Sequence, residues 1–151
     1  MIVSYDLRHA GGVQAHVHSL TRELEHLGHT VHVFGTRNTR YDYSSYTQIA
    51  HSTLFAMPEG GRGAVASPLP EVDAADAVRA GNYDIIHIHD PFIPFVAWDI
   101  AMRVESTIVA TFHTCWNDTS LFRHMEFGLK LASDYFRRYV DGSIYVSDMA
   151  R

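Results

Sequence analysis

Short apolar segments alternate with helical patterns along most of this chain, and that alternation most constrains the fold. Segments typical of strands occur at residues 1–5, 29–36, 83–90, 106–113 and 142–148. Parallel strands joined by crossover helices are covered on both faces, so they are largely apolar. The sequence therefore predicts an α/β domain with a doubly wound parallel sheet of the Rossmann-like class.

Helical patterns fill the gaps between these strands. The first helix has apolar residues four and three positions apart, at Val13, Val17, Leu20, Leu24 and Leu27. Gly28 supplies the left-handed residue that ends it. Further helices are expected over residues 71–80 and 94–104, and a long amphipathic one over 119–140.

Residues 37–70 and the two ends of the chain fit this pattern least well. "YTQIAHSTLFAMP" predicts one or two short strands, whereas the Gly- and Pro-rich "EGGRGAVASPLP" predicts a loop. The first strand is short, and "VSDMAR" resembles a strand followed by the start of a helix with Asp148 as its N-cap. The chain thus stops inside a repeating unit, and we expect one half of a larger protein.

Composition excludes several classes of partner. The net charge of −5 argues against nucleic acid, which needs a cationic face, and against an anionic membrane surface. The single cysteine, Cys115, excludes an internal disulfide and fits a reducing cytoplasm. The 11 histidines are scattered along the sequence without HExxH or a Cys/His cluster, so no metal site is predicted.

Polar residues follow the carboxyl ends of the predicted strands, where ligands bind to open α/β sheets. They lie at Tyr5 to Gly12, at His89 to Pro91, at His113 to Trp116 and at Ser147-Asp148. Gly11 and Gly12 permit either close approach of an anion to a helix N-terminus or merely a tight turn. No P-loop lysine and no GxGxxG fingerprint accompanies them, which disfavours a dehydrogenase.

Each polar residue at this edge has a structural alternative. Gln14, in the first helical turn, could bond a substrate hydroxyl or lie on the surface. His87 is expected to be packed and hydrogen-bonded within its strand, whereas His89 is the better site candidate. Asp90 could simply shape the turn before proline. His113 could exchange a proton or bond a hydroxyl.

Four motifs in order, "GGVQAHV", "DIIHIHDP", "IVATFHT" and "YVSD", resemble the N-terminal domain of retaining GT-B glycosyltransferases of family four. The resemblance is greatest to the bacterial phosphatidylinositol mannosyltransferases and covers residues 1–151. It implies one Rossmann-like domain that holds the acceptor and a second domain, absent from this chain, that holds a nucleotide-sugar. The chain by itself is then expected to be inactive, and no cofactor or metal is expected besides that co-substrate.

The resemblance also implies roles for individual residues. Gly11 and Gly12 would face the donor diphosphate, where a helix N-terminus stabilises negative charge. His113 would contact the transferred sugar at the reaction centre. The remaining roles are acceptor binding by Tyr5, Gln14 and Thr114, and an edge position for His89, Asp90 and Ser147.

Membrane docking is expected only at the periphery of the inner face, and charge does not support it. The stretch where the mannosyltransferases are basic is here "PEVDAADAVRAG", residues 70–81, which carries a single Arg and is acidic. The alternative to an enzyme domain is a non-catalytic α/β domain that binds an anion or small ligand.

Overall fold

The fold is centred on one parallel sheet. The structure is a computed structural model that describes residues 1–37, 40–56, 62–70, 72–91, 93, 95–113 and 134–148, without the side chains of 55–56, 62–63 and 68–70. Its six-stranded sheet has the order β3-β2-β1-β6-β7-β8, and all neighbouring strands run parallel. The strands are β1 (Ile2–Val3), β2 (Val33–Gly35), β3 (Tyr46–Gln48), β6 (Ile85–His89), β7 (Thr107–Phe112) and β8 (Gly142–Tyr145). The strand order reverses between β1 and β6, so the predicted doubly wound, Rossmann-like class is confirmed.

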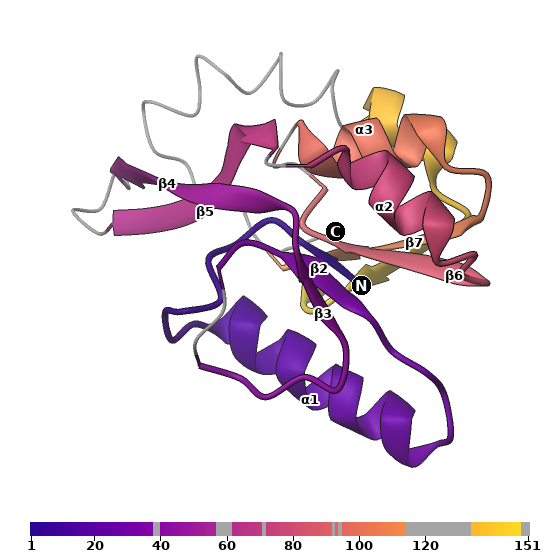
Figure 1. Cartoon of the computed structure of the whole chain (residues 1–151), viewed down its shortest axis with the longest axis horizontal. Helices are drawn as coiled ribbons and strands as arrows, with labels where there is room; N and C mark the ends of the chain where they lie inside the picture. The colour runs from indigo at the N-terminus through magenta and orange to yellow at the C-terminus, as the bar shows by residue number, and fades with distance from the viewer. Residues whose placement is uncertain are drawn as a thin grey trace.

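Helices cover both faces of this sheet. Helix α1 (Gly12–His26) lies on one face, and α2 (Ala74–Ala80) and α3 (Val96–Arg103) lie side by side on the other (Figure 1). Adjacent residues of β1 supply the two cores, because side chains alternate along a strand. Ile2 packs in the core beneath α2 and α3, whereas Val3 packs in the core beneath α1.

Helix α1 follows its predicted pattern except at the last position. The buried residues centre on Val17, which is fully buried. Gly28 has φ +89°, and the His29 N–H donates to the Leu24 carbonyl at 3.0 Å, so the predicted glycine end of the helix is confirmed. Leu27, expected in the apolar stripe, is 74% exposed because it caps the helix beyond its last turn.

The predicted loop over residues 59–70 is wrong in most of its length. Strand β5 (Arg62–Pro70) pairs antiparallel with β4 (Ala50–Ala56) in a separate two-stranded sheet. The segment after β1 also pairs with β5, since the Ala66 N–H donates to the Ser4 carbonyl at 2.6 Å. These partners are distant in sequence, so the local Gly and Pro signals could not reveal the strand. The strands predicted within residues 46–58 are confirmed as β3 and β4.

The remaining predicted elements are either present but shorter than predicted, or fall on residues outside the described part of the chain. Helices α2 and α3 confirm those expected at 71–80 and 94–104. Of the expected helix over 119–140, residues 119–133 are outside the described part of the chain, and its end includes the short 3-10 helix η1 (Arg137–Tyr139). The residues after Asp148, which would show whether it is an N-cap, are also outside it. No helix among the described residues is long and apolar enough to cross a membrane.

Candidate functional site

The carboxyl ends of β1, β6 and β7 meet at the point where the strand order reverses, and Asp90 joins them there. Its carboxylate accepts a hydrogen bond from the Tyr5 hydroxyl at 2.7 Å and another from the His113 backbone N–H at 2.6 Å. Asp90 is fully buried and has φ +49°, a conformation that aspartate tolerates better than most residues. Asp90 therefore shapes the turn before Pro91, as the sequence allowed, and also holds two predicted site residues in place.

A second buried carboxylate lies just beyond β1, at Asp6. The Asp6 side chain is 0% exposed and accepts hydrogen bonds from Arg8 Nε at 3.0 Å and from Ser52 Oγ at 2.5 Å. Burial alone would raise the pKa of Asp6, but the bonds from Arg8 and Ser52 and the charge of Arg8 lower it to about 2. The sequence placed Asp6 at the sheet edge without assigning it a role. Only its position directly after a strand could have singled it out.

The two glycines at the start of α1 differ in their surroundings. Gly11 is the N-cap of α1 in extended backbone, and a Cβ there would collide with the Gln14 side chain. A Cβ at Gly12 would meet none of the described residues within 4 Å, so among these residues space is open at the first residue of the helix. No side chain in the described part of the chain caps this N-terminus, and its backbone N–H groups remain suited to an anion.

Gln14 is buried rather than on the surface, so the surface alternative is wrong. It is 8% exposed, and its Nε2 donates to the Asp6 carbonyl at 3.1 Å. This bond ties the first turn of α1 to the segment after β1. Gln14 thus lies at the predicted edge, and its contact to Asp6 orders the edge itself.

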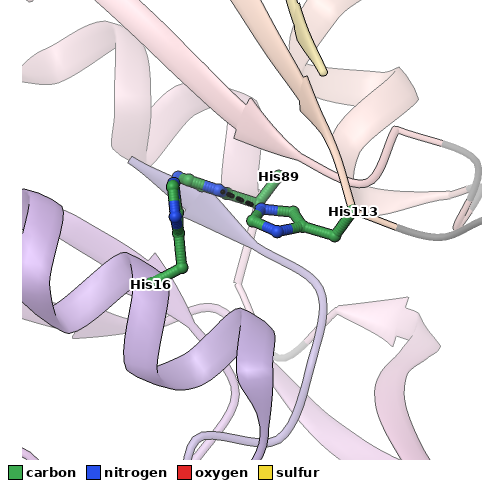
Figure 2. A group of neighbouring side chains, drawn as sticks. All are labelled: His16, His89 and His113. Atoms are coloured by element: carbon green, nitrogen blue, oxygen red, sulfur yellow. Dashed lines mark hydrogen bonds between the residues drawn. The ribbon is translucent and has the colours of Figure 1, made fainter. Parts of the chain in front are cut away.

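Three histidines converge at the same edge, although their positions in the sequence are scattered. His16 comes from α1, His89 ends β6 and His113 follows β7 (Figure 2). His89 Nδ1 lies 3.1 Å from His113 Nε2, and the His16 ring centroid lies 4.7 Å from that of His113. One ring nitrogen from each lies within 4.8 Å of the other two, so these residues could hold a metal.

Burial keeps two of these imidazoles and their neighbour uncharged at neutral pH. It lowers the pKa of His89 well below its usual value and lowers that of His87 to about 4. Burial also lowers the pKa of His113, and the Asp90 carboxylate opposes that shift. His87 Nε2 lies 2.6 Å from the Thr111 hydroxyl, so the prediction of a hydrogen-bonded His87 is confirmed. Neutral imidazoles such as His113 can accept a proton or donate a hydrogen bond.

The structure does not bring every predicted residue to this edge. Ser147 is exposed and lines an open depression beside β8, together with Ser143, Tyr145, Val146 and Asp148. Thr114, expected to assist acceptor binding, lies outside the described residues, as does Cys115. The described edge therefore gathers Tyr5, Asp6, the start of α1, the histidine cluster and Asp90.

Comparison with known proteins agrees with the motifs at this edge. The family model of Glycosyltransferase Family 4 matches residues 10–151. The chain is similar to proteins named phosphatidyl-myo-inositol mannosyltransferase. It is 29% identical to that of Mycolicibacterium smegmatis and 31% identical to that of Mycobacterium leprae, over 100% of this chain in both. That of Propionibacterium freudenreichii is 27% identical over 82% of the chain.

These alignments cover only part of the relatives. The chain spans 38% of the Mycolicibacterium protein, 40% of the Mycobacterium leprae protein and 34% of the Propionibacterium protein. No solved structure gives a significant match. The family match extends over nearly the whole chain, from two residues before α1 to residue 151. This chain belongs to Glycosyltransferase Family 4.

Proposed function

We propose that this chain is the acceptor-side domain of a retaining glycosyltransferase that moves a hexose from a nucleotide-sugar to a hydroxylated acceptor. The acceptor class is a polyol, a glycolipid or a glycan. The observation that carries the proposal is the convergence of the sequence motifs "GGVQAHV", "DIIHIHDP" and "IVATFHT" on one edge, where α1 begins and β6 and β7 end. The donor-binding domain lies outside these 151 residues, which is consistent with relatives more than twice as long.

The open N-terminus of α1 is assigned to the donor diphosphate. Breaking the bond between sugar and diphosphate leaves negative charge on phosphate oxygens, and backbone N–H groups at a helix N-terminus stabilise it. The space beside Gly12 supports this role, because a phosphate could approach the backbone there. Gly11 contributes by leaving room for the Gln14 side chain. No cofactor or metal ion enters the proposed reaction.

His113 is assigned to the transferred sugar and Tyr5 and Gln14 to the acceptor pocket, with Thr114 beside them. Asp90 supports this arrangement because it holds both the Tyr5 hydroxyl and the His113 backbone. Preorganised groups of this kind are the main source of rate enhancement at sites where charge develops. The histidine edge and the helix N-terminus would thus act on the same sugar–phosphate bond.

We place the protein in the cytoplasm. Within this chain, α2 does not supply a surface for docking to an anionic membrane. The carboxylates of Asp73 and Asp76 lie on the outer face and form ion pairs with Arg79 and Arg103. The cationic groups of this helix region are therefore already engaged with carboxylates. Peripheral contact with an anionic lipid surface would have to come from elsewhere in the protein.

The direct test is transfer from nucleotide-sugars by the full-length protein and by its His113→Ala variant. A mannose donor is the first probe, because the relatives are named mannosyltransferases. We expect His113→Ala to lower turnover by about 100-fold, the usual cost of losing one preorganised group. His18→Ala is the matched control, because His18 lies on α1 outside the histidine cluster. Equal turnover in His113→Ala and the parent would contradict the assignment.

Calorimetric titration distinguishes the enzyme domain from the alternative of a non-catalytic binding domain. If the donor site lies mainly in the other domain, the 151-residue chain should bind nucleotide-sugars weakly and the full-length protein tightly. Tight nucleotide-sugar binding by the 151-residue chain alone would overturn the division of the site between two domains.

A further inference from the structure

The three histidines at the sheet edge could together hold a metal ion, which the proposed transfer reaction does not use although it uses His113. Among the described residues they are the one group of three or more potential ligands close enough to share a metal ion. They come from α1, from the end of β6 and from the residue after β7, and their side chains point toward one another (Figure 2). The sheet fixes the spacing of two of them, since β6 and β7 are paired neighbours up to His89 and Thr111.

The spacing of the ring nitrogens fits tetrahedral coordination. Zn–N bonds of about 2.0–2.1 Å place two nitrogen ligands on one ion about 3.3 Å apart. His89 Nδ1 and His113 Nε2 are 3.1 Å apart, already near that separation. The nitrogens of all three residues lie within 4.8 Å of one another. His16 would have to move by about 1.5 Å at most, which rotation about its side-chain bonds can supply.

The chemistry of the cluster also suits a cation. Metals bind imidazole through a ring nitrogen, and His89 and His113 offer ring nitrogens at a site that is buried at His89 and partly buried at His113. The ring of His89 could serve an ion in two ways. It could bind through Nδ1, replacing the bond to His113, or through Nε2, which is buried with no hydrogen-bond partner among the described residues. The buried Asp90 carboxylate, which accepts a hydrogen bond from the His113 backbone N–H, places an acidic group near the cluster.

We propose that His16, His89 and His113 bind one first-row transition-metal ion, such as Zn²⁺, with its fourth position open to water. Three imidazoles favour Zn²⁺, Co²⁺, Ni²⁺ or Cu²⁺ over Mg²⁺ and Ca²⁺, which take oxygen ligands. His16 and His113 are only partly buried, so an ion can reach the cluster from solvent. The geometry that supports the metal site does not depend on the proposed function. If His113 also contacts the transferred sugar, metal binding and transfer would exclude each other.

Cobalt provides a readout that does not depend on activity. The full-length protein is purified without a histidine tag, stripped with a chelator and titrated with Co²⁺, whose visible absorption is intense in tetrahedral coordination. We expect one Co²⁺ per chain with tetrahedral absorption, displacement of that Co²⁺ by Zn²⁺, and no displacement by Mg²⁺. Isothermal titration with Zn²⁺ then gives the dissociation constant.

Variants assign the ion to these ligands. His16→Ala and His113→Ala should each raise the dissociation constant for Zn²⁺ at least about tenfold and remove the tetrahedral Co²⁺ spectrum. Thermal unfolding verifies that both variants are folded, and both sites are partly buried rather than in the core. The control His18→Ala, on the same helix, should leave the constant and the spectrum unchanged. Absence of the tetrahedral spectrum, or an equal loss in His18→Ala, would overturn the proposal.

Discussion

Asp6 and Asp73 both pair with arginine, but the two carboxylates differ in their exposure to solvent. At the sheet edge, Asp6 is 0% exposed and is held by Arg8 and Ser52. On the outer face, Asp73 is 44% exposed and lies 2.8 Å from Arg103, which is 38% exposed. Both arginines are similarly exposed, Arg8 at 37%, so the difference lies in the carboxylates. Exposed pairs contribute little because water screens them, whereas a carboxylate without solvent contact depends on its hydrogen bonds within the protein. The polar groups that the fold encloses are therefore concentrated where substrates are proposed to bind.

Removing the buried carboxylate is the most severe test of this contrast. Asp6→Ala should lower the free energy of unfolding by about 2 kcal/mol, because Arg8 and Ser52 lose their shared charged acceptor while solvent still reaches Arg8. Urea denaturation measures the change. Asp6→Asn, which keeps an oxygen for Ser52, should lose less. A change too small to measure in Asp6→Ala would mean that the edge is no better organised than the outer face.

Acid should weaken the same interaction. The pKa of Asp6 is lowered from 3.8 to about 2 in the folded chain, so its contribution is present above pH 4. That contribution is lost as the pH falls from about 4 to 2, since the unfolded chain binds the proton first. A tenfold difference in proton affinity between the two states is worth about 1.4 kcal/mol, so the lowered pKa predicts a loss of about 2 kcal/mol. Denaturation series at pH 2 to 6 should show this loss in the parent and not in Asp6→Asn.

A smaller effect is expected from a single hydrogen bond at the edge. Tyr5→Phe removes the hydroxyl that donates to Asp90 and should lower the free energy of unfolding by about 1 kcal/mol. The bond from His113 to Asp90 remains, so the fold should persist. Denaturation in urea tests the stability. If Tyr5→Phe were as costly as Asp6→Ala, Tyr5 would have a larger structural role than one bond.

The outer face should give the smallest response. Arg103→Ala removes ion pairs with Asp73, Asp76 and Asp99, all of them on exposed side chains. We expect no measurable change in the urea midpoint at physiological ionic strength, because salt screens exposed charges. A loss as large as that of Asp6→Ala would remove the contrast between the two regions.

The sequence predicted the order of strands and helices well, because burial on a sheet or helix face leaves a local pattern. The stripe around Val17 and the glycine end at Gly28 are signals of this kind. Strand β5 left no such signal, since its partners are β4 and the segment after β1. Its Gly and Pro residues favour a loop unless those distant partners are known.

The sequence predicted which edge of the sheet carries the candidate site, but not the contacts between its side chains. Strand ends can be placed from sequence, so Tyr5, His89, Asp90 and His113 were assigned to one edge. The approach of His16 to the other two histidines depends on how α1 packs over the sheet, and no spacing within the sequence encodes that. The burial of Gln14 has the same origin, because its partner is the Asp6 backbone.

The central claim is that the open start of α1 receives a donor diphosphate, and Gly12 tests it most directly. A methyl group at Gly12 meets nothing within 4 Å among the described residues, so Gly12→Ala should not lower the unfolding midpoint. Gly11→Ala is a contrasting variant, because its methyl group would displace the Gln14 amide from its hydrogen bond to the Asp6 carbonyl and should lower the unfolding midpoint. In the full-length protein, we predict that Gly12→Ala raises KM for the nucleotide-sugar about tenfold or more, the cost of about 1.4 kcal/mol of binding. An unchanged KM and kcat in Gly12→Ala would contradict the account.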